Sequence, residues 1–274
     1  MADRRRNVQM FWKRCRPVAI ETSVNFEPRG LTTEAKIIGV YRRRNARLVL
    51  DLLEPALEQG WTTAWWALDG IEGSLERYTV GEGPGEKFPL VNETLRLSGS
   101  PVSWTLVSDD DLSFRQGDMT RLVRLCDSAR FDIAQPARAR DSAHNFRITA
   151  AARLARARLT TFVESGPLFV VGPRFRDLVL PLPKALGMGW GVELEWFDLM
   201  EKGCRLGIVD SVVIEHLGTA TEYDTTQLHA RLRAELAARG ATSFRPFQNT
   251  LAAWRPWQRR PAWVDHGQDA AQTS

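Results

Sequence analysis

Short apolar runs typical of buried strands alternate with segments of helical periodicity in the first half of the chain, and this alternation constrains the fold most. The strand-like runs cover residues 36–41, 62–68, 77–80 and 102–108, and the helical segments cover residues 48–59, 88–97 and 119–128. Strands that alternate with helices at this interval form βαβ units. The sequence therefore predicts an α/β fold with a mostly parallel central sheet flanked by helices.

The second half of the chain continues the pattern less regularly. It predicts strands over residues 131–136, 161–171 and 206–215, helices over 192–202 and 225–239, and an irregular Trp-, Arg- and Pro-rich tail from residue 240. The expected organisation is an irregular arm over residues 1–33, a main domain over 34–222, a C-terminal helix and tail that pack on it over 223–256, and a disordered tail over 257–274.

Composition argues against several classes of protein. The three cysteines are far apart and lack C-x-x-C spacing, which disfavours a disulfide framework or a zinc site. No apolar stretch approaches the roughly 20 residues of a membrane span, and no apolar segment typical of a signal peptide follows Met1. We therefore expect a reducing, cytoplasmic location. The net charge of +4 suits a ligand that carries phosphate.

Clustered carboxylates follow one of the predicted strands. Asp109, Asp110 and Asp111 end the apolar run 102–108, and His216 ends the run 206–215. Hard cations combine carboxylates with substrate phosphates, imidazole is a frequent ligand for transition metals, and ligands of open α/β sheets bind at the carboxyl ends of strands. A divalent cation site is one interpretation. A solvated acidic turn and a structural histidine are the other.

Two loops contain candidates for binding a phosphorylated donor. Arg42 follows the first strand, and a guanidinium group suits phosphate oxygens. The glycine-rich loop 81–87 precedes a helix, whose N-terminus favours an anion, so Lys87 and Asn92 are further candidates. Asp69, at the end of the second strand, is another. A solvated basic loop and a flexible turn are the alternative interpretations.

A Gly-Trp-Gly turn precedes the helix predicted over residues 192–202. Glu193 and Glu195 lie in its first turn, where the helix dipole favours carboxylates. Either glutamate is also a candidate general base beside an acceptor hydroxyl, with Trp190 and Gly191 as candidates for contacting the acceptor. A base requires position first and a tuned pKa second.

The order of these motifs resembles that of GT-A type glycosyltransferases, in particular the family-2-like bacterial transferases that use nucleotide-diphosphate sugars. The resemblance covers about residues 35–220. It rests on the βαβ start and the aspartate triplet, and on Gln-Pro at 135–136, Glu-Ser-Gly-Pro at 164–167, Gly-Trp-Gly-Val-Glu at 189–193, Gly-Ile-Val-Asp at 207–210 and His216. Glu164 matches a family acid of unclear role, and a buried structural carboxylate is the alternative. It implies a Rossmann-like GT-A fold that binds a nucleotide-diphosphate sugar.

The resemblance also implies a metal site. Asp109 and Asp111 match the D-x-D motif, which binds Mn²⁺ or Mg²⁺ and the ribose of the donor, and Asp110 belongs to the same donor-binding segment. His216 matches a late metal-ligand histidine. The cation would bridge the diphosphate of the donor.

The same resemblance implies an inverting displacement in which an acceptor hydroxyl attacks the donor sugar. Glu193 matches the acid that contacts or deprotonates the acceptor. Many relatives carry two adjacent acids at this turn, whereas Leu194 separates Glu193 from Glu195 here, so the identity of the base stays open. The donor base, the sugar and the acceptor, which is a glycan, a lipid-linked molecule or a small molecule, stay open too.

Two other functions remain open. One is a nucleotide-binding module without turnover, which contacts a partner or a membrane through the Trp- and Arg-rich segment 254–263, because these residue types suit a membrane interface. Packing of these tryptophans on the domain is the alternative. The other is a different metal-dependent nucleotide enzyme, which gives no reason for a Gly-Trp-Gly-x-Glu turn before a late histidine. No nucleic-acid partner is expected, and no oligomeric state is predicted.

Overall fold

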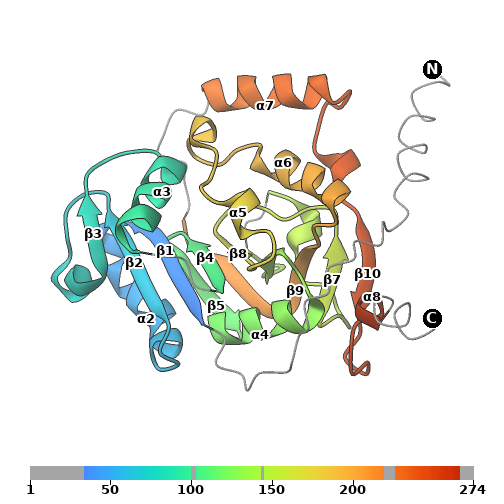
Figure 1. The fold of residues 1–274 in the computed structure, drawn as a ribbon, viewed down its shortest axis with the longest axis horizontal. Coiled ribbons are helices and arrows are strands. Elements are labelled where there is room, and N and C mark those ends of the chain that lie inside the picture. Colours follow the sequence, from blue (N-terminus) through green and yellow to red (C-terminus); the bar gives the residue numbers. More distant parts are fainter. Residues whose placement is uncertain (1–33, 100–102, 143–144, 219–225, 266–274) are drawn as a thin grey trace.

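The structure is a computed structural model that describes residues 34–99, 103–142, 145–218 and 226–265. Its strands form one sheet in the order β10-β7-β9-β6-β8-β4-β1-β2-β3, with β5 paired to β9 off this path (Figure 1). The strands are β1 Ala35–Tyr41, β2 Thr62–Ala67, β3 Thr79–Glu82, β4 Trp104–Ser108, β5 Leu112–Gln116, β6 Ile133–Arg138, β7 Ala157–Thr160, β8 Leu168–Val171, β9 Leu206–His216 and β10 Thr250–Trp254.

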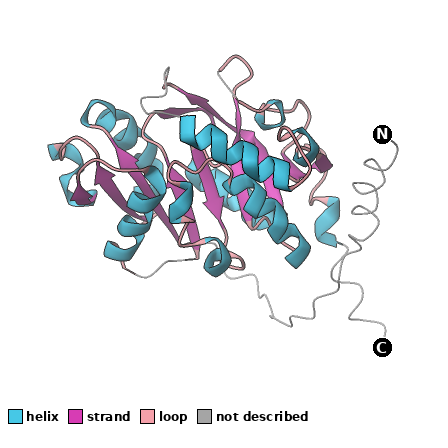
Figure 2. Cartoon of the chain, turned by 90° about the horizontal axis from the view of Figure 1, so that it is seen from above, coloured by secondary structure: helices cyan, strands magenta, loops and turns pink. Residues whose placement is uncertain are grey.

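Helices cover both faces of this sheet. The α-helices are α2 Ala46–Leu57, α3 Lys87–Leu97, α4 Met119–Ala129, α5 Arg176–Val179, α6 Val192–Leu199, α7 Thr226–Ala238 and α8 Ala262–Asp265. The short 3₁₀ helices are η1 Arg43–Asn45, η2 Gly73–Tyr78, η3 Arg147–Thr149, η4 Lys184–Leu186, η5 Met200–Lys202 and η6 Arg245–Phe247. In Figure 1, α2 and α4 lie below the strands and α3 and α6 lie above them. Viewed from above, α7 crosses over the molecule (Figure 2).

Strand directions follow from the pairing. β1 is parallel to β2 and β4, β2 is parallel to β3, and β6 is parallel to β9. The antiparallel pairs β4–β8, β6–β8, β7–β9, β5–β9 and β10–β7 then leave seven strands in one direction and three, β5, β7 and β8, in the other. The prediction of an α/β fold with a mostly parallel sheet between helices is confirmed.

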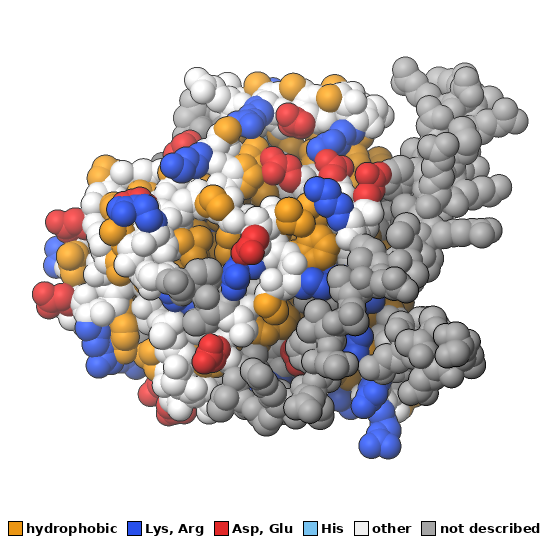
Figure 3. Space-filling view, viewed as in Figure 1, with side chains coloured by type: hydrophobic (Ala, Val, Ile, Leu, Met, Phe, Trp, Pro, Cys, Tyr) orange, Lys and Arg blue, Asp and Glu red, His pale blue; other side chains and the backbone are white. Residues whose placement is uncertain are grey.

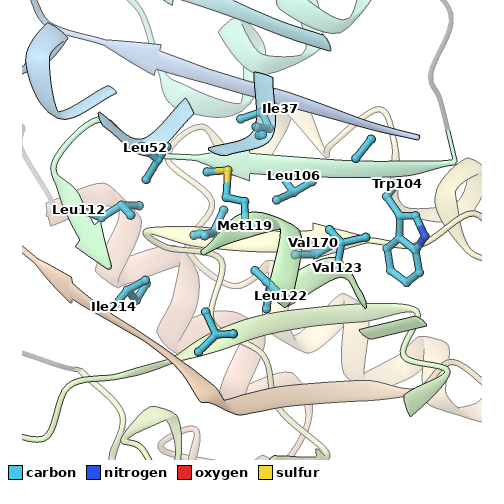
Figure 4. Close-up of a cluster of buried hydrophobic side chains, with 14 of the residues drawn as sticks. Ile37, Leu52, Trp104, Leu106, Leu112, Met119, Leu122, Val123, Val170 and Ile214 are labelled. Atoms are coloured by element: carbon cyan, nitrogen blue, oxygen red, sulfur yellow. The ribbon is translucent and has the colours of Figure 1, made fainter. Parts of the chain in front are cut away.

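One apolar cluster holds α2 and α4 against the sheet. Leu52 of α2 and Leu122 and Val123 of α4 are buried against Ile37 of β1 and Leu106 of β4 (Figure 4). Apolar residues recur at helical spacing in both helices, so each presents one apolar stripe to the strands. Burying each of these side chains contributes about 1.5–3 kcal/mol.

A second cluster fixes the helices on the opposite face. Phe88 and Val91 of α3, Val179 of α5 and Trp196 of α6 are all buried in it. A third cluster, which contains Leu236 of α7, seats that helix against α6. Because α3 and α6 are packed in these clusters, the turn that precedes each helix is fixed at the point where the helix begins.

The strand predicted over residues 161–171 is two strands. β7 pairs with β9 and β10, whereas β8 pairs with β4 and β6. The chain changes neighbours between them, so residues 161–167 form a connection, and Glu164 lies in it instead of inside a strand. β5 was not predicted, because its five residues offer too short a pattern.

The C-terminal segment is more regular than the sequence predicts. β10 adds an antiparallel strand to β7. The indole Nε1 of Trp263 donates to the main-chain oxygen of Ala129 at 2.9 Å, and its ring stacks on Phe131 with centroids 5.9 Å apart. Residues 250–265 therefore pack on the main body. The predicted arm over 1–33 and the end of the tail, 266–274, lie outside the described residues.

Candidate functional site

The ends of β4 and β9 bring two distant parts of the chain together. β4 ends at Ser108, directly before the aspartates, and β9 ends at His216. β5 pairs antiparallel with the last part of β9 and places Leu112 opposite His216. The main-chain oxygen of Asp111 accepts a hydrogen bond from the amide of Leu217 at 2.7 Å. This pairing fixes the triplet beside the histidine.

Three side chains at this junction form a set of ligand atoms. A carboxylate oxygen of Asp109, one of Asp111 and a ring nitrogen of His216 all lie within 4.8 Å of one another. Asp109 Oδ1 is 2.6 Å from Nζ of Lys87, and Asp111 Oδ1 is 2.9 Å from His216 Nε2. Two carboxylates with one imidazole suit a divalent cation such as Mn²⁺.

Gly218 closes one side of this set. A Cβ at this position would overlap Oδ2 of Asp111 and lie 3.3 Å from Nε2 of His216. The main chain at Gly218 therefore lies close to both candidate ligands, at a distance that leaves no room for a larger side chain.

Charge interactions stabilise the ionised forms of both partners. The hydrogen bond with Asp111 raises the pKa of His216, against the effect of burial. Burial alone would raise the pKa of Asp111, yet the hydrogen bond and charge of His216 leave it below its usual value. A bound cation would take the place of the proton that these two side chains share.

Asp110 faces away from this set. Its Oδ2 accepts a hydrogen bond from the main-chain amide of Arg42 at 2.6 Å, so it joins the loop after β4 to the loop after β1. Burial raises the pKa of Asp110 to about 6. Asp69 has a similar place, because its Oδ1 accepts from the amide of Arg43 at 2.8 Å. Arg42 and Asp69 therefore lie at the carboxyl ends of neighbouring parallel strands.

Helix α3 contributes Lys87 from its first turn. The side chain of Lys87 is buried, and its Nζ contacts Asp109 and donates to the main-chain oxygen of Ser165 at 3.3 Å. Asn92, one and a half turns later, bonds at both polar ends to the main chain of Leu182, at 2.8 and 2.7 Å. Both hydrogen bonds of the Asn92 side chain therefore hold the segment at Leu182 in place.

Glu193 occupies a buried position at the start of α6. Gly191, with φ of 100°, is the N-cap of the helix, a conformation that favours glycine. One oxygen of Glu193 accepts from the amide and the hydroxyl of Ser165 at 3.1 and 2.7 Å, and the other accepts from the amide of Gly191 at 3.1 Å. Burial nevertheless raises the pKa of Glu193.

Glu195 lies on another face of α6. It is exposed, and the charges nearest to it are those of Arg231 and Glu235 on α7. Burial raises its pKa. Trp190 also turns toward α7, where its ring meets that of His229 edge-on with centroids 4.6 Å apart. The two glutamates are therefore not equivalent, since only Glu193 connects to Ser165.

Ser165, to which the sequence assigns no role, links the parts of the site. Its main-chain oxygen receives Lys87 and its hydroxyl donates to Glu193, so contacts run from Asp109 through Lys87 and Ser165 to Glu193. The only sequence signal for it is its place in the Glu-Ser-Gly-Pro segment 164–167.

Glu164 forms a buried pair with Arg138, a partner that the sequence does not indicate. Arg138 Nε lies 4.0 Å from Glu164 Oε2, and Asn145 donates to Glu164 Oε1 at 3.2 Å. Burial raises the pKa of Glu164 to about 7. Among the described residues, Arg138 Nε, Arg138 Nη1 and Glu164 Oε2 have no hydrogen-bond partner.

Among the described residues, no helix has both the length and the apolar character needed to cross a bilayer. Neither the family models nor the curated proteins include a match to the sequence.

Solved structures do resemble the chain. The structure of GalNAc-T7 with UDP, GalNAc and Mn²⁺ matches with a TM-score of 0.55 and 8% identity, over 75% of this chain and 49% of that chain. Staphylococcus aureus TarS 1–349 in complex with UDP-GlcNAc matches with a TM-score of 0.46 and 10% identity, over 70% of this chain and 60% of that one. The chain thus covers about half of GalNAc-T7. The likeness to GalNAc-T7 shows that the chain has the GT-A nucleotide-sugar transferase fold.

Proposed function

We propose that this protein is a metal-dependent glycosyltransferase that moves a sugar from a nucleotide-diphosphate donor to an acceptor hydroxyl. The observation that carries the proposal is the ligand set of Asp109, Asp111 and His216. It lies where strands of a GT-A fold end, the edge at which α/β sheets bind ligands. The fold alone would not assign an activity.

The donor end of the site is assigned to residues that surround this set. Asp109, Asp111 and His216 would hold Mn²⁺ or Mg²⁺, and such an ion stabilises the negative charge on a departing nucleoside diphosphate. Lys87 adds a buried positive charge beside Asp109. Arg42 lies at the same strand ends and is proposed to contact the donor, while Asp110 and Asp69 hold the loops that shape its binding site.

The acceptor end is assigned to the turn before α6. We assign the general base to Glu193 in preference to Glu195, because Glu193 is buried and connected through Ser165 and Lys87 to Asp109. Trp190 and Gly191, on the same turn, are proposed to contact the acceptor. Glu193 would take the proton of the attacking hydroxyl during a single displacement with inversion.

A thermal-shift panel tests the donor site. UDP, GDP, dTDP, CDP and ADP are each added with and without Mn²⁺, and a ligand that binds the folded state at 100 times its Kd stabilises it by about 2.7 kcal/mol. We expect one nucleoside diphosphate to raise the unfolding temperature only when Mn²⁺ is present. Asp111→Asn, which keeps the shape of the side chain, should lose that shift.

Two outcomes would contradict the proposal. If no nucleotide shifts the unfolding temperature of well-folded protein, with or without Mn²⁺, the proposed donor site is wrong. If Asp111→Asn keeps the full Mn²⁺-dependent shift, the aspartates do not hold the ion.

A further inference from the structure

Two loops beside the β7–β10 end of the sheet present the most exposed large apolar side chains among the described residues. Leu154, just before β7, is 64% exposed, and Trp257, just after β10, is 70% exposed. Residues 153–156 and 255–260 are called the paired loops below. Single exposed apolar residues are ordinary, whereas two that project from one place need an explanation.

Hydrogen bonds join these loops into one surface. The guanidinium group of Arg156 donates to the main-chain oxygen of Pro256 at 2.7 and 3.2 Å. From the other side, Nη1 of Arg255 donates to the main-chain oxygen of Leu154 at 3.3 Å. These bonds place the loops that carry Leu154 and Trp257 side by side.

The backbone at Leu154 is unfavourable for its residue type. Its φ is 59°, in the left-handed region that glycine or asparagine adopts more readily than leucine. The side chain gains no compensating burial, because most of its surface is exposed. A residue in this conformation whose side chain is mostly exposed suggests a role outside the fold.

The two chain segments that carry the tips are basic. Segments 146–160 and 250–264 contain no Asp or Glu and hold seven arginines: Arg147, Arg153, Arg156, Arg158, Arg255, Arg259 and Arg260. The acid that faces them, Asp210 of β9, is buried and accepts hydrogen bonds from Arg158 at 2.9–3.1 Å. Figure 3 shows Lys and Arg side chains projecting at the lower right, where the chain beyond β10 lies in Figure 1.

An arginine-lined hollow adjoins the paired loops. It has a volume of about 520 Å³, and its lining includes the buried acid Asp210 together with Arg121, Arg140, Arg153, Arg156 and Pro256. The last three of these residues belong to the paired loops. Guanidinium groups arranged around a hollow suit the oxygens of a phosphate group.

We propose that the paired loops dock on an anionic phospholipid bilayer. Trp257 and Leu154 enter the interfacial layer, where tryptophan is favoured, and the surrounding arginines face lipid phosphates. Apolar tips within a ring of basic residues bind membranes through both burial and charge. This inference does not depend on the proposed transferase activity, since it uses no residue of the donor or acceptor site.

Vesicle sedimentation of the full chain tests the inference. Vesicles of phosphatidylcholine alone are compared with vesicles that also contain phosphatidylglycerol, at low and high salt. We expect the protein to sediment with the anionic vesicles at low salt, and to stay in solution with the neutral vesicles or at high salt. Failure to sediment with the anionic vesicles would overturn the proposal.

Two double variants address the two kinds of contact. Leu154→Asn with Trp257→Ala removes the apolar tips, and asparagine tolerates the left-handed backbone. Arg153→Glu with Arg259→Glu reverses charge in both loops. Each should weaken binding to anionic vesicles at least about tenfold, while an unchanged far-UV spectrum and unfolding temperature show that the protein is folded.

Matched variants elsewhere provide the controls. Leu178→Ala changes another exposed leucine, at 57% exposure, and Arg47→Glu with Arg233→Glu reverses two exposed charges. Both should bind like the parent protein. Equal binding by the paired-loop variants would place the contact elsewhere on the chain. A dimer in solution that Trp257→Ala abolishes would assign the loops to a second copy of the chain instead.

Discussion

At the scale of single residues, the two glutamates of the turn before α6 have different surroundings. Glu193 is buried among donors from Ser165 and Gly191, whereas Glu195 is exposed near α7. Glu193→Gln should keep Mn²⁺-dependent nucleotide binding and lower the transfer rate by about 10²–10⁴-fold, the usual contribution of a general base. Product formation from nucleotide sugars that carry the base identified by the thermal-shift panel measures this.

The matched variant is Glu195→Gln, which should keep transfer within a few-fold of the parent rate because its side chain lies away from Ser165. Normal transfer by Glu193→Gln together with a large loss in Glu195→Gln would reverse the assignment of the base.

Glu164 makes stability depend on pH. Its pKa is about 7 in the folded state against a usual 4.5, because it is buried. Between these values the folded state keeps a proton that the unfolded state has released, so the free energy of unfolding decreases as pH rises through this window. The difference between these two pKa values corresponds to a change of roughly 3 kcal/mol in the free energy of unfolding.

Glu164→Gln should remove this part of the pH dependence. The measurement is urea unfolding at several pH values from about 5 to 8, and the readout is the slope with pH, because the variant also removes the charge that faces Arg138. Glu58 is exposed and directly follows α2, so Glu58→Gln should leave the dependence of the free energy of unfolding on pH as it is in the parent protein. An unchanged slope in Glu164→Gln would mean that this carboxyl titrates normally.

At the scale of elements, the central strands pack too closely for a larger side chain at Gly39 of β1. A Cβ there would overlap the main-chain oxygen of Ser108 and the ring of the buried Trp65. Gly39→Ala should lower the free energy of unfolding by about 1–3 kcal/mol or more, as overpacking does. Urea unfolding measures the change.

Gly73→Ala is the control, because nothing lies within 4 Å of a Cβ at that position. It should change stability by less than about 0.5 kcal/mol. Equal stability of the two variants would show that β1, β2 and β4 can separate to accept a methyl group.

Which elements can be predicted from sequence depends on what defines them. β1, β4 and the helices next to them carry their own apolar pattern, so they are found from the sequence. The break between β7 and β8 depends on a change of partners, and β10 depends on the free edge of β7. Neither is a property of the segment itself.

The candidate site follows the same division. The sequence analysis grouped Asp109, Asp111 and His216, and the structure places their ligand atoms together. The hydrogen bond of Asp110 depends on the amide of Arg42 in another loop. The contacts of Ser165 depend on where α3 and α6 begin. Such contacts between loops have no periodic signal.

At the scale of the whole molecule, the C-terminal segment completes the sheet. β10 covers the edge of β7, and Trp254 is buried in the apolar cluster between α4 and the sheet. Ending the chain after Asn249 should lower the unfolding temperature by at least about 5 °C, because the change exposes this apolar surface and costs several kcal/mol. It should also promote association through the open edge.

Circular dichroism and light scattering during heating measure both effects. A chain that ends after Asp265 keeps β10 and α8 and provides the comparison. If the two truncated proteins unfold at the same temperature and stay monomeric, β10 is dispensable for the sheet.

The contact between Asp111 and His216 joins residues 105 positions apart in the chain. During synthesis at about 5–20 residues per second, the aspartates precede the histidine by roughly 5–20 s. The residues of β1 to β4 are therefore synthesised well before His216, which completes the proposed ion site. Cation binding at the proposed site would then be possible only once β9 has been translated and has joined the sheet.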